Sequence, residues 1–121
     1  MTRELGLMAE VKGPALLAEY LIARCRNETD SVQLCWHMRR VKYGVREAAR
    51  LLGMPASHLS NVIAGKKYLP HNSIAFQQLC GNWAIRQYQD KAAGLLTVIE
   101  TPEQREIRVL RSELEAARRA A

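Results

Sequence analysis

The chain has 121 residues, 48% of them hydrophobic and 25% charged, with a formal net charge of +6. This composition is typical of one globular domain, and aromatic residues and strand-like alternation are scarce, so we predict an all-α fold. No run approaches the roughly 18 consecutive apolar residues that a membrane span needs. The N-terminus lacks a charged-then-apolar signal layout. We therefore expect a cytoplasmic protein.

Three cysteines, Cys25, Cys35 and Cys80, form no CxxC pair, and their odd number argues against a disulfide framework. A zinc site would have to combine Cys35 and His37 with Cys80 or His71, a spacing that matches no metal module. We expect core thiols and neither a metal nor another cofactor.

The first predicted helix covers "PALLAEYLIARC", with Pro14 at its first position and apolar residues at helical spacing. "NET" ends it, and a second helix is expected to begin with Asp30 as N-cap and Gln33 three residues on. Apolar residues predict that this second helix is buried: Leu34, Cys35, Trp36, Met38 and Val41. Gly44 either ends it or caps the next helix.

Two short helices follow, "VREAARLLG" and "ASHLSNVIA", which end at Gly53 and Gly65. The stretch "SIAFQQLCGNWAIRQYQDKAAGLL" has apolar residues at steps of three and four. This spacing fits one long helix, or two that meet near Gly81.

Positive charge is concentrated in the middle of the chain. Residues 31–89 hold eight basic residues and one acidic residue, a net +7, and the remainder carries −1. A field confined to one segment points to a polyanionic partner. Basic side chains near the short helices are therefore candidate phosphate contacts: Arg39, Arg40, Arg46, Lys66 and Lys67. The two lysines could also belong to an ordinary solvated turn.

Two short helices joined by a tight turn are typical of a helix-turn-helix, in which the first helix braces the second in the DNA major groove. Ala49 is small enough for close helix approach, and Gly53 supplies the positive φ that the turn needs. Outward positions of the second helix are candidates to approach DNA: Ala56, Ser57, His58, Ser60 and Asn61. Asn61 is the best of them, because an amide can form two hydrogen bonds with an adenine edge.

Two of these residues could instead have no role in DNA binding. His58 could be a solvated surface residue, and the Ser60 hydroxyl could bond back within its own helix.

The pattern A-x3-G-x5-L-S-x4-G-K resembles the Cro and repressor type helix-turn-helix of the XRE-like, lambda-repressor-like family. It is formed here by Ala49, Gly53, Leu59, Ser60, Gly65 and Lys66. The resemblance covers about residues 34–79. It implies base contacts at Ala56, Ser57 and Asn61, and phosphate contacts around Ser60, Lys66 and Lys67. Val45 departs from the family's usual phosphate-binding glutamine, and Pro55 departs from its usual Ser or Thr cap.

The expected architecture is a lambda-repressor-like helix-turn-helix bundle with an N-terminal helical extension over 1–29, a DNA-binding domain over 30–100 and a C-terminal helix over 101–121. We expect a sequence-specific transcriptional regulator, a repressor that occupies a palindromic operator in double-stranded DNA as a homodimer, with no small-molecule effector. The alternative is a protein-interaction module, such as an antitoxin or adaptor, on the same fold. An enzyme is not expected, because no acid lies within a helical turn of His37 and no nucleophile elbow or phosphate loop occurs.

The C-terminal helix is expected to start at Thr101, with Pro102 at its first position and Gln104 reaching back to the cap. Its apolar residues form a heptad seam of about two repeats: Ile107, Leu110, Leu114, Ala117 and Ala121. An isolated helix this short is marginal in water, so it must pack on something. It could fold back on its own domain. We expect instead that Ile107, Leu110 and Leu114, together with a helix over Trp83–Leu96, form a dimer interface.

Overall fold

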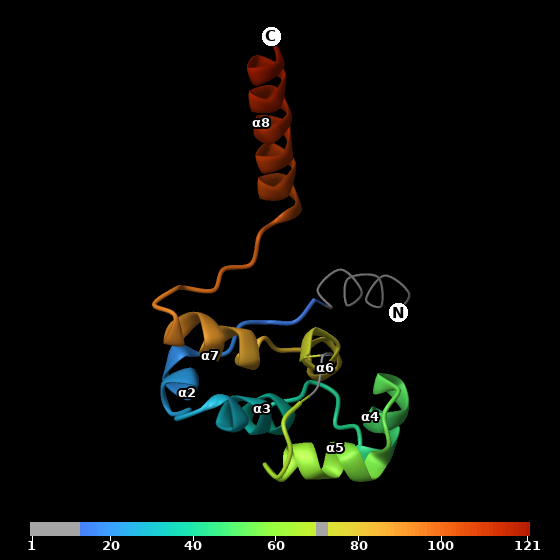
Figure 1. The fold of residues 1–121 in the computed structure, drawn as a ribbon. Helices are drawn as coiled ribbons and strands as arrows, with labels where there is room; N and C mark the ends of the chain where they lie inside the picture. The colour runs from blue at the N-terminus through green and yellow to red at the C-terminus, as the bar shows by residue number, and fades with distance from the viewer. Residues whose placement is uncertain (1–12, 70–72) are drawn as a thin grey trace, which may run out of the picture.

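The computed structural model describes residues 13–69 and 73–121, which hold seven helices and no strand (Figure 1). The helices are α2 (Glu19–Ala23), α3 (Glu28–His37), α4 (Val45–Leu52), α5 (Ala56–Ile63), α6 (Ser73–Cys80), α7 (Ala84–Ala92) and α8 (Pro102–Ala120). The all-α prediction is confirmed for this part of the chain. None of these helices is long and apolar enough to cross a membrane.

The hydrophobic core lies where α3 to α7 meet, and α2 closes it at the side of α7. Its largest apolar side chains are fully buried: Phe76, Leu59, Ile85 and Val62. The rings of Trp36 and Phe76 stack with centroids 6.3 Å apart. Burial of this kind contributes about 1.5–3 kcal/mol for each large apolar side chain, so the core supplies most of the stability of these short helices.

Three buried amide side chains hydrogen-bond to the backbone of other parts of the fold, two of them to segments that are distant in the sequence. Asn82 donates to the carbonyl of Cys35 at 3.0 Å and accepts from the N–H of Ala84 at 3.1 Å. Gln87 pairs with both backbone groups of Leu17, each at 2.9 Å. Gln77 similarly accepts from the N–H of Arg86 at 2.9 Å. Each amide satisfies its own polar atoms, which removes the penalty of burying them.

The first helix of the described residues, α2, is shorter than the sequence predicts, and the predicted N-terminal extension is described from Gly13 onward. Pro14 is not helical, because Ala15 forms an isolated parallel bridge with Asn82. The N–H of Ala15 donates to Gly81, and its carbonyl accepts from Trp83, both at 3.0 Å. Backbone groups engaged in this way cannot start a helix, so α2 begins only at Glu19.

The prediction that Asp30 is the N-cap of α3 is wrong. Asn27 is the N-cap, and its side chain accepts from the N–H of Asp30 at 2.9 Å. Asp30 lies inside the first turn and accepts from the N–H of Arg26 instead. The helix ends at His37, so Met38 and Val41 lie beyond it and are 41% and 49% exposed rather than buried.

The segment predicted as one helix or two is two helices. Gly81 has φ +78°, which ends α6, and α7 stops at Ala92 rather than reaching Leu96. The capping box of α8 is confirmed, since Thr101 and Gln104 exchange hydrogen bonds at 3.1 Å and 2.9 Å. α8 has no buried residue and projects away from the other described helices (Figure 1), so it does not fold back on its own domain.

Candidate nucleic-acid interface

The helices α4 and α5 pack against each other across a tight corner. Ala48 and Ala49 are buried on the inner face of α4, where a larger side chain would hold the two helices apart. Gly53 ends α4 with φ +69°, and the N–H of Met54 then donates to the carbonyl of Ala49 at 3.0 Å. The turn that the sequence predicted at Gly53 is therefore present.

The exposed side of α5 carries small and polar residues. Leu59 and Val62 face the core, which at 100° per residue leaves Ser57, Ser60 and Asn61 on the opposite side. Ser57 and Ser60 are exposed, and Asn61 is partly buried. No hydrogen bond of the Ser60 hydroxyl occurs within the described ranges, so that group is available to an external partner.

His58 and Ala56 do not lie at the centre of that face. Both are partly buried, and Ala56 packs against the edge of the core. Nε2 of His58 is buried and, alone among the buried side-chain nitrogens and oxygens of the described residues, has no hydrogen-bond partner. His58 is thus a flank residue of α5, one turn before the buried Val62, and not a freely solvated one.

Lys66 and Lys67 lie in a fixed turn immediately after α5. Their backbone N–H groups both donate to the carbonyl of Asn61, at 2.8 Å and 3.3 Å. Both side chains are exposed, and neither makes an ion pair or hydrogen bond with another described residue. The turn therefore holds two free ammonium groups beside the residue that is the best candidate for base contact.

Gln33 anchors this turn from α3, a role that the sequence did not suggest. Its Nε2 donates to the carbonyl of Ile63, at the end of α5, at 3.1 Å. Gly65 follows with φ +80°, and a Cβ there would lie 3.1 Å from Cγ2 of Thr29. Close packing of α3 on the glycine fixes the position of the lysines.

The predicted arginine contacts divide into two kinds. Arg46 is exposed on the first turn of α4, with no ion pair or hydrogen bond to another described residue. Arg39 lies 4.1 Å over the ring of Trp36 and donates to the carbonyls of Trp36 and Tyr43. Arg40 donates to the carbonyls of Gly13 and Gly81, at 3.0 Å and 3.2 Å. Arg39 and Arg40 are engaged in structural contacts, whereas Arg46 is not.

The N-termini of α4 and α5 have no side-chain cap. Gly44 and Pro55 occupy the N-cap positions, whereas Asn27 and Thr101 cap α3 and α8 with their side chains. The first N–H groups of a helix attract anions through unpaired donors and the helix dipole. Two such ends, one of them next to Arg46, add to the positive field of this region.

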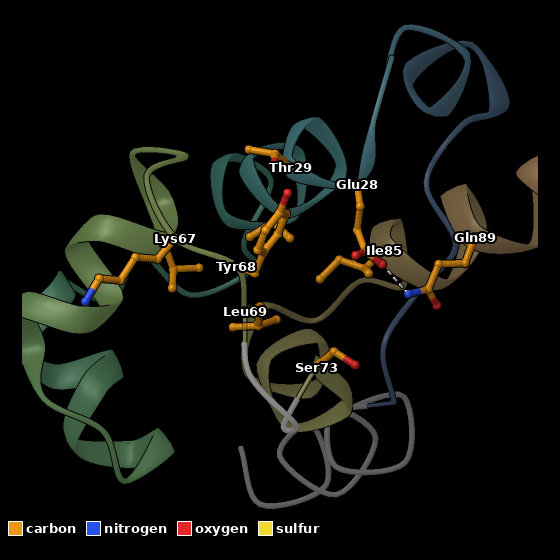
Figure 2. A pocket seen from close by; sticks show the side chains of 10 residues that line it. Glu28, Thr29, Lys67, Tyr68, Leu69, Ser73, Ile85 and Gln89 are labelled. Carbon is orange, nitrogen blue, oxygen red and sulfur yellow. Dashed lines mark hydrogen bonds between the residues drawn. The ribbon is translucent and has the colours of Figure 1, made fainter.

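A cavity of about 150 Å³ lies beside the lysine turn, between the start of α3, the segment after α5, α6 and α7 (Figure 2). Polar side chains form part of its lining, including Lys67 and a Glu28–Gln89 hydrogen bond, over the apolar Leu69 and Ile85. The one unpartnered buried nitrogen of the described chain, on His58, does not line it. Nothing in this lining selects a particular ligand.

Two of the three cysteines are core thiols, as expected, whereas Cys25 is only partly buried and lies outside the core. Cys35 and Cys80 are buried and unbridged, and a hydrogen bond with Cys80, together with burial, raises the pKa of the Cys35 thiol well above its usual range. A raised pKa disfavours the thiolate that metal binding requires. No group of three or more potential metal ligands lies together in residues 13–69 and 73–121. His71 lies outside the described residues.

Comparisons with protein-family models, with curated proteins and with solved structures find no match to this chain.

Proposed function

We propose that this protein is a sequence-specific DNA-binding transcriptional regulator of the helix-turn-helix type, with α4 as the bracing helix and α5 as the helix that enters the major groove. It acts as a repressor by occupying its operator, and it binds as a homodimer. The proposal needs no cofactor and no effector.

One observation carries the proposal: the exposed side of α5, with Ser57, Ser60 and Asn61, is continuous with the turn that holds Lys66 and Lys67. Small polar side chains allow a helix to approach base edges, and cations just beyond it can neutralise phosphates. A helix of this polarity beside two unpaired lysines fits a duplex better than it fits an apolar protein surface.

Electrostatics of the wider region support the same partner. Glu47, the one acid between residues 31 and 89, forms an ion pair with Arg50 on the surface of α4. Arg46, Lys66 and Lys67 are left to dominate the local field. Phosphate contacts of this kind supply a large share of DNA affinity and make it steeply dependent on salt.

A gel-shift experiment on fragments of the source genome, with excess unrelated competitor DNA, tests the proposal. A regulator of this kind retards one or a few fragments at a competitor excess that abolishes binding to all others. Equal retardation of every fragment would indicate non-specific binding, and no retardation at low salt would contradict DNA binding altogether.

The alternative is an antitoxin or adaptor that binds another protein. The exposed apolar residues near the C-terminus, among them Leu95, Leu96 and Val98, would be its contact surface. This alternative gives no role to the positive charge of the α4–α5 region. It would be favoured if this protein formed a stable complex with another protein and bound no DNA.

A further inference from the structure

The apolar seam of α8 is exposed, because no other described part of the chain packs against it. Ile107, Leu110 and Leu114 are 50–56% exposed, and no residue of the 19-residue helix is buried. In heptad terms Ile107 and Leu114 occupy a positions, while Leu110 and Ala117 occupy d positions. Because large apolar side chains on a lone helix favour association, the helix needs a partner surface.

The charges beside the seam are segregated by sign. Glu106 and Glu113 occupy the g positions on one edge, and Arg111 and Arg118 occupy the e positions on the other. None of these four side chains forms an ion pair or hydrogen bond with another residue in the described part of the chain.

The outer face of the same helix differs. There Arg119 pairs with Glu115 at 2.8 Å, and Arg108 pairs with Glu100 at 2.7 Å. Unpaired charges thus flank the apolar seam, where a second helix would meet them.

The sign pattern selects one orientation of that second helix. In a parallel pair, each g side chain faces the e side chain of the partner's next heptad, so Glu106 would face Arg111 of the partner subunit and Glu113 would face Arg118 of the partner subunit. In an antiparallel pair, g faces g and e faces e, which would bring carboxylates together and guanidinium groups together. Like charges at such positions repel.

We propose that α8 pairs with α8 of a second copy of this chain as a parallel, in-register, two-stranded coiled coil. In the first heptad, Ile107 at a and Leu110 at d are the combination that favours two strands. The inference rests on the homodimer proposed above, which it extends by fixing orientation and register, but it does not depend on DNA binding.

Two heptads are short, and the parallel arrangement also supplies further contacts. The segment before α8 exposes Leu95, Leu96, Val98 and Ile99 by 51–73%, and with α6 and α7 these residues line a groove of about 690 Å³. Parallel pairing places the two copies of this segment at the same end of the coil. Antiparallel pairing would separate them by the helix length, about 28 Å for 19 residues at 1.5 Å per residue.

A mixing experiment tests the orientation in the full-length protein without DNA. The charge-inverted variant carries Glu106→Arg, Glu113→Arg, Arg111→Glu and Arg118→Glu, which preserves net charge. It should sediment as a dimer by itself, because g and e remain opposite in sign. When it is mixed with differently tagged wild-type chains, we expect heterodimers well below their statistical share, since every parallel heterodimer brings like charges together.

Preferential heterodimer formation would overturn the proposal, because only antiparallel pairs gain opposite charges in the mixture. A matched control, Glu115→Arg with Arg119→Glu, exchanges the charges of the outer pair and also preserves net charge, so it should mix statistically with the wild type. A wild-type chain that is monomeric at tens of micromolar would overturn the pairing itself, whatever the outcome with DNA.

Cross-linking tests the register. Ala117→Cys, at a d position near the end of the seam, should form a disulfide between two copies under mild oxidation in a Cys25→Ser background. Ser112→Cys, on the outer face, should not. An antiparallel coil would place residue 117 opposite the start of the partner's seam, so a dimer in which Ala117→Cys fails to cross-link also contradicts the proposal.

Discussion

The backbone carbonyl of Asn61 accepts a hydrogen bond from the N–H of Lys66 at 2.8 Å, which ties the turn after α5 to the exposed face of that helix. The candidate base contact and the candidate phosphate contact are therefore held in one rigid unit. If α5 lies in the major groove, any DNA that brings a base edge to Asn61 also meets Lys66 and Lys67 beside it.

Replacing both lysines, Lys66→Ala with Lys67→Ala, should weaken binding to the operator and to unrelated DNA alike. The slope of log affinity against log salt should fall by about 0.9 for each phosphate that the protein no longer neutralises. Titrations by fluorescence anisotropy at four or more salt concentrations measure this slope. A slope equal to that of the wild type would assign the lysines to an ordinary solvated turn.

Asn61→Ala should change sequence preference rather than general affinity. Removal of a bidentate base contact costs about 1–3 kcal/mol on the matched site and much less on others. Ser57→Ala should act in the same direction but more weakly. Selection from a random DNA library provides the measurement, and identical selected sites for both variants and the wild type would show that the recognition face lies elsewhere.

The local parts of this arrangement could be predicted, because they depend on residues close in the sequence. Gly53 adopts the positive φ that its position demanded, and Thr101 and Gln104 form the capping box that their spacing indicated. The failures involve distant partners. Ala15 was expected in a helix but pairs with Asn82, which lies 67 residues further along the chain, and no periodicity signals such a bridge.

The same distinction explains the arginines. The sequence shows that positive charge clusters near the short helices. It does not show which of these side chains are left without hydrogen bonds in the folded chain. Arg39 and Arg40 are engaged by carbonyls of Tyr43, Gly13 and Gly81, and those acceptors are positioned only by the folded chain. The sequence predicted His58 on the outward face of α5, but its Nε2 is buried in the folded chain. That burial depends on the elements packed beside α5, which the sequence does not reveal.

Replacement of Arg39 should therefore lower mainly the stability of the fold, whereas replacement of Arg46 should lower mainly the affinity for DNA. Arg39→Ala removes a cation–π contact and two hydrogen bonds to carbonyls, so we expect the free energy of unfolding to fall by about 1–3 kcal/mol. Arg46→Ala touches no such contact and should change stability by less than about 0.5 kcal/mol, while weakening DNA binding at low salt. Urea denaturation and anisotropy on the same preparations compare the two. Equal decreases in stability would contradict the division between structural and free arginines.

Glycine substitutions test how tightly α3 holds the lysine turn. Gly53→Ala meets open space, so it should cost only the left-handed backbone penalty of about 1–2 kcal/mol. Gly65→Ala pays the same penalty and also places a Cβ 3.1 Å from Cγ2 of Thr29 and 3.2 Å from Nε2 of Gln33. It should be the more destabilising of the two and should also weaken DNA binding. If urea denaturation shows the two variants to be equally destabilised, the contact with α3 does not constrain the turn.

A chain ending at Glu100 tests whether α8 holds the dimer together. No residue of α8 is buried in the single chain, so its removal should leave the packing of the core unchanged. We expect the truncated protein to sediment as a monomer at concentrations where the full chain is a dimer. Its affinity for a palindromic site should fall toward that for a single half-site, because two linked heads bind with an effective concentration that separate heads lack. A truncated chain that remains dimeric and binds the palindrome as tightly as the full chain would transfer the interface to the exposed segment over residues 95–99 and leave α8 without a role in assembly.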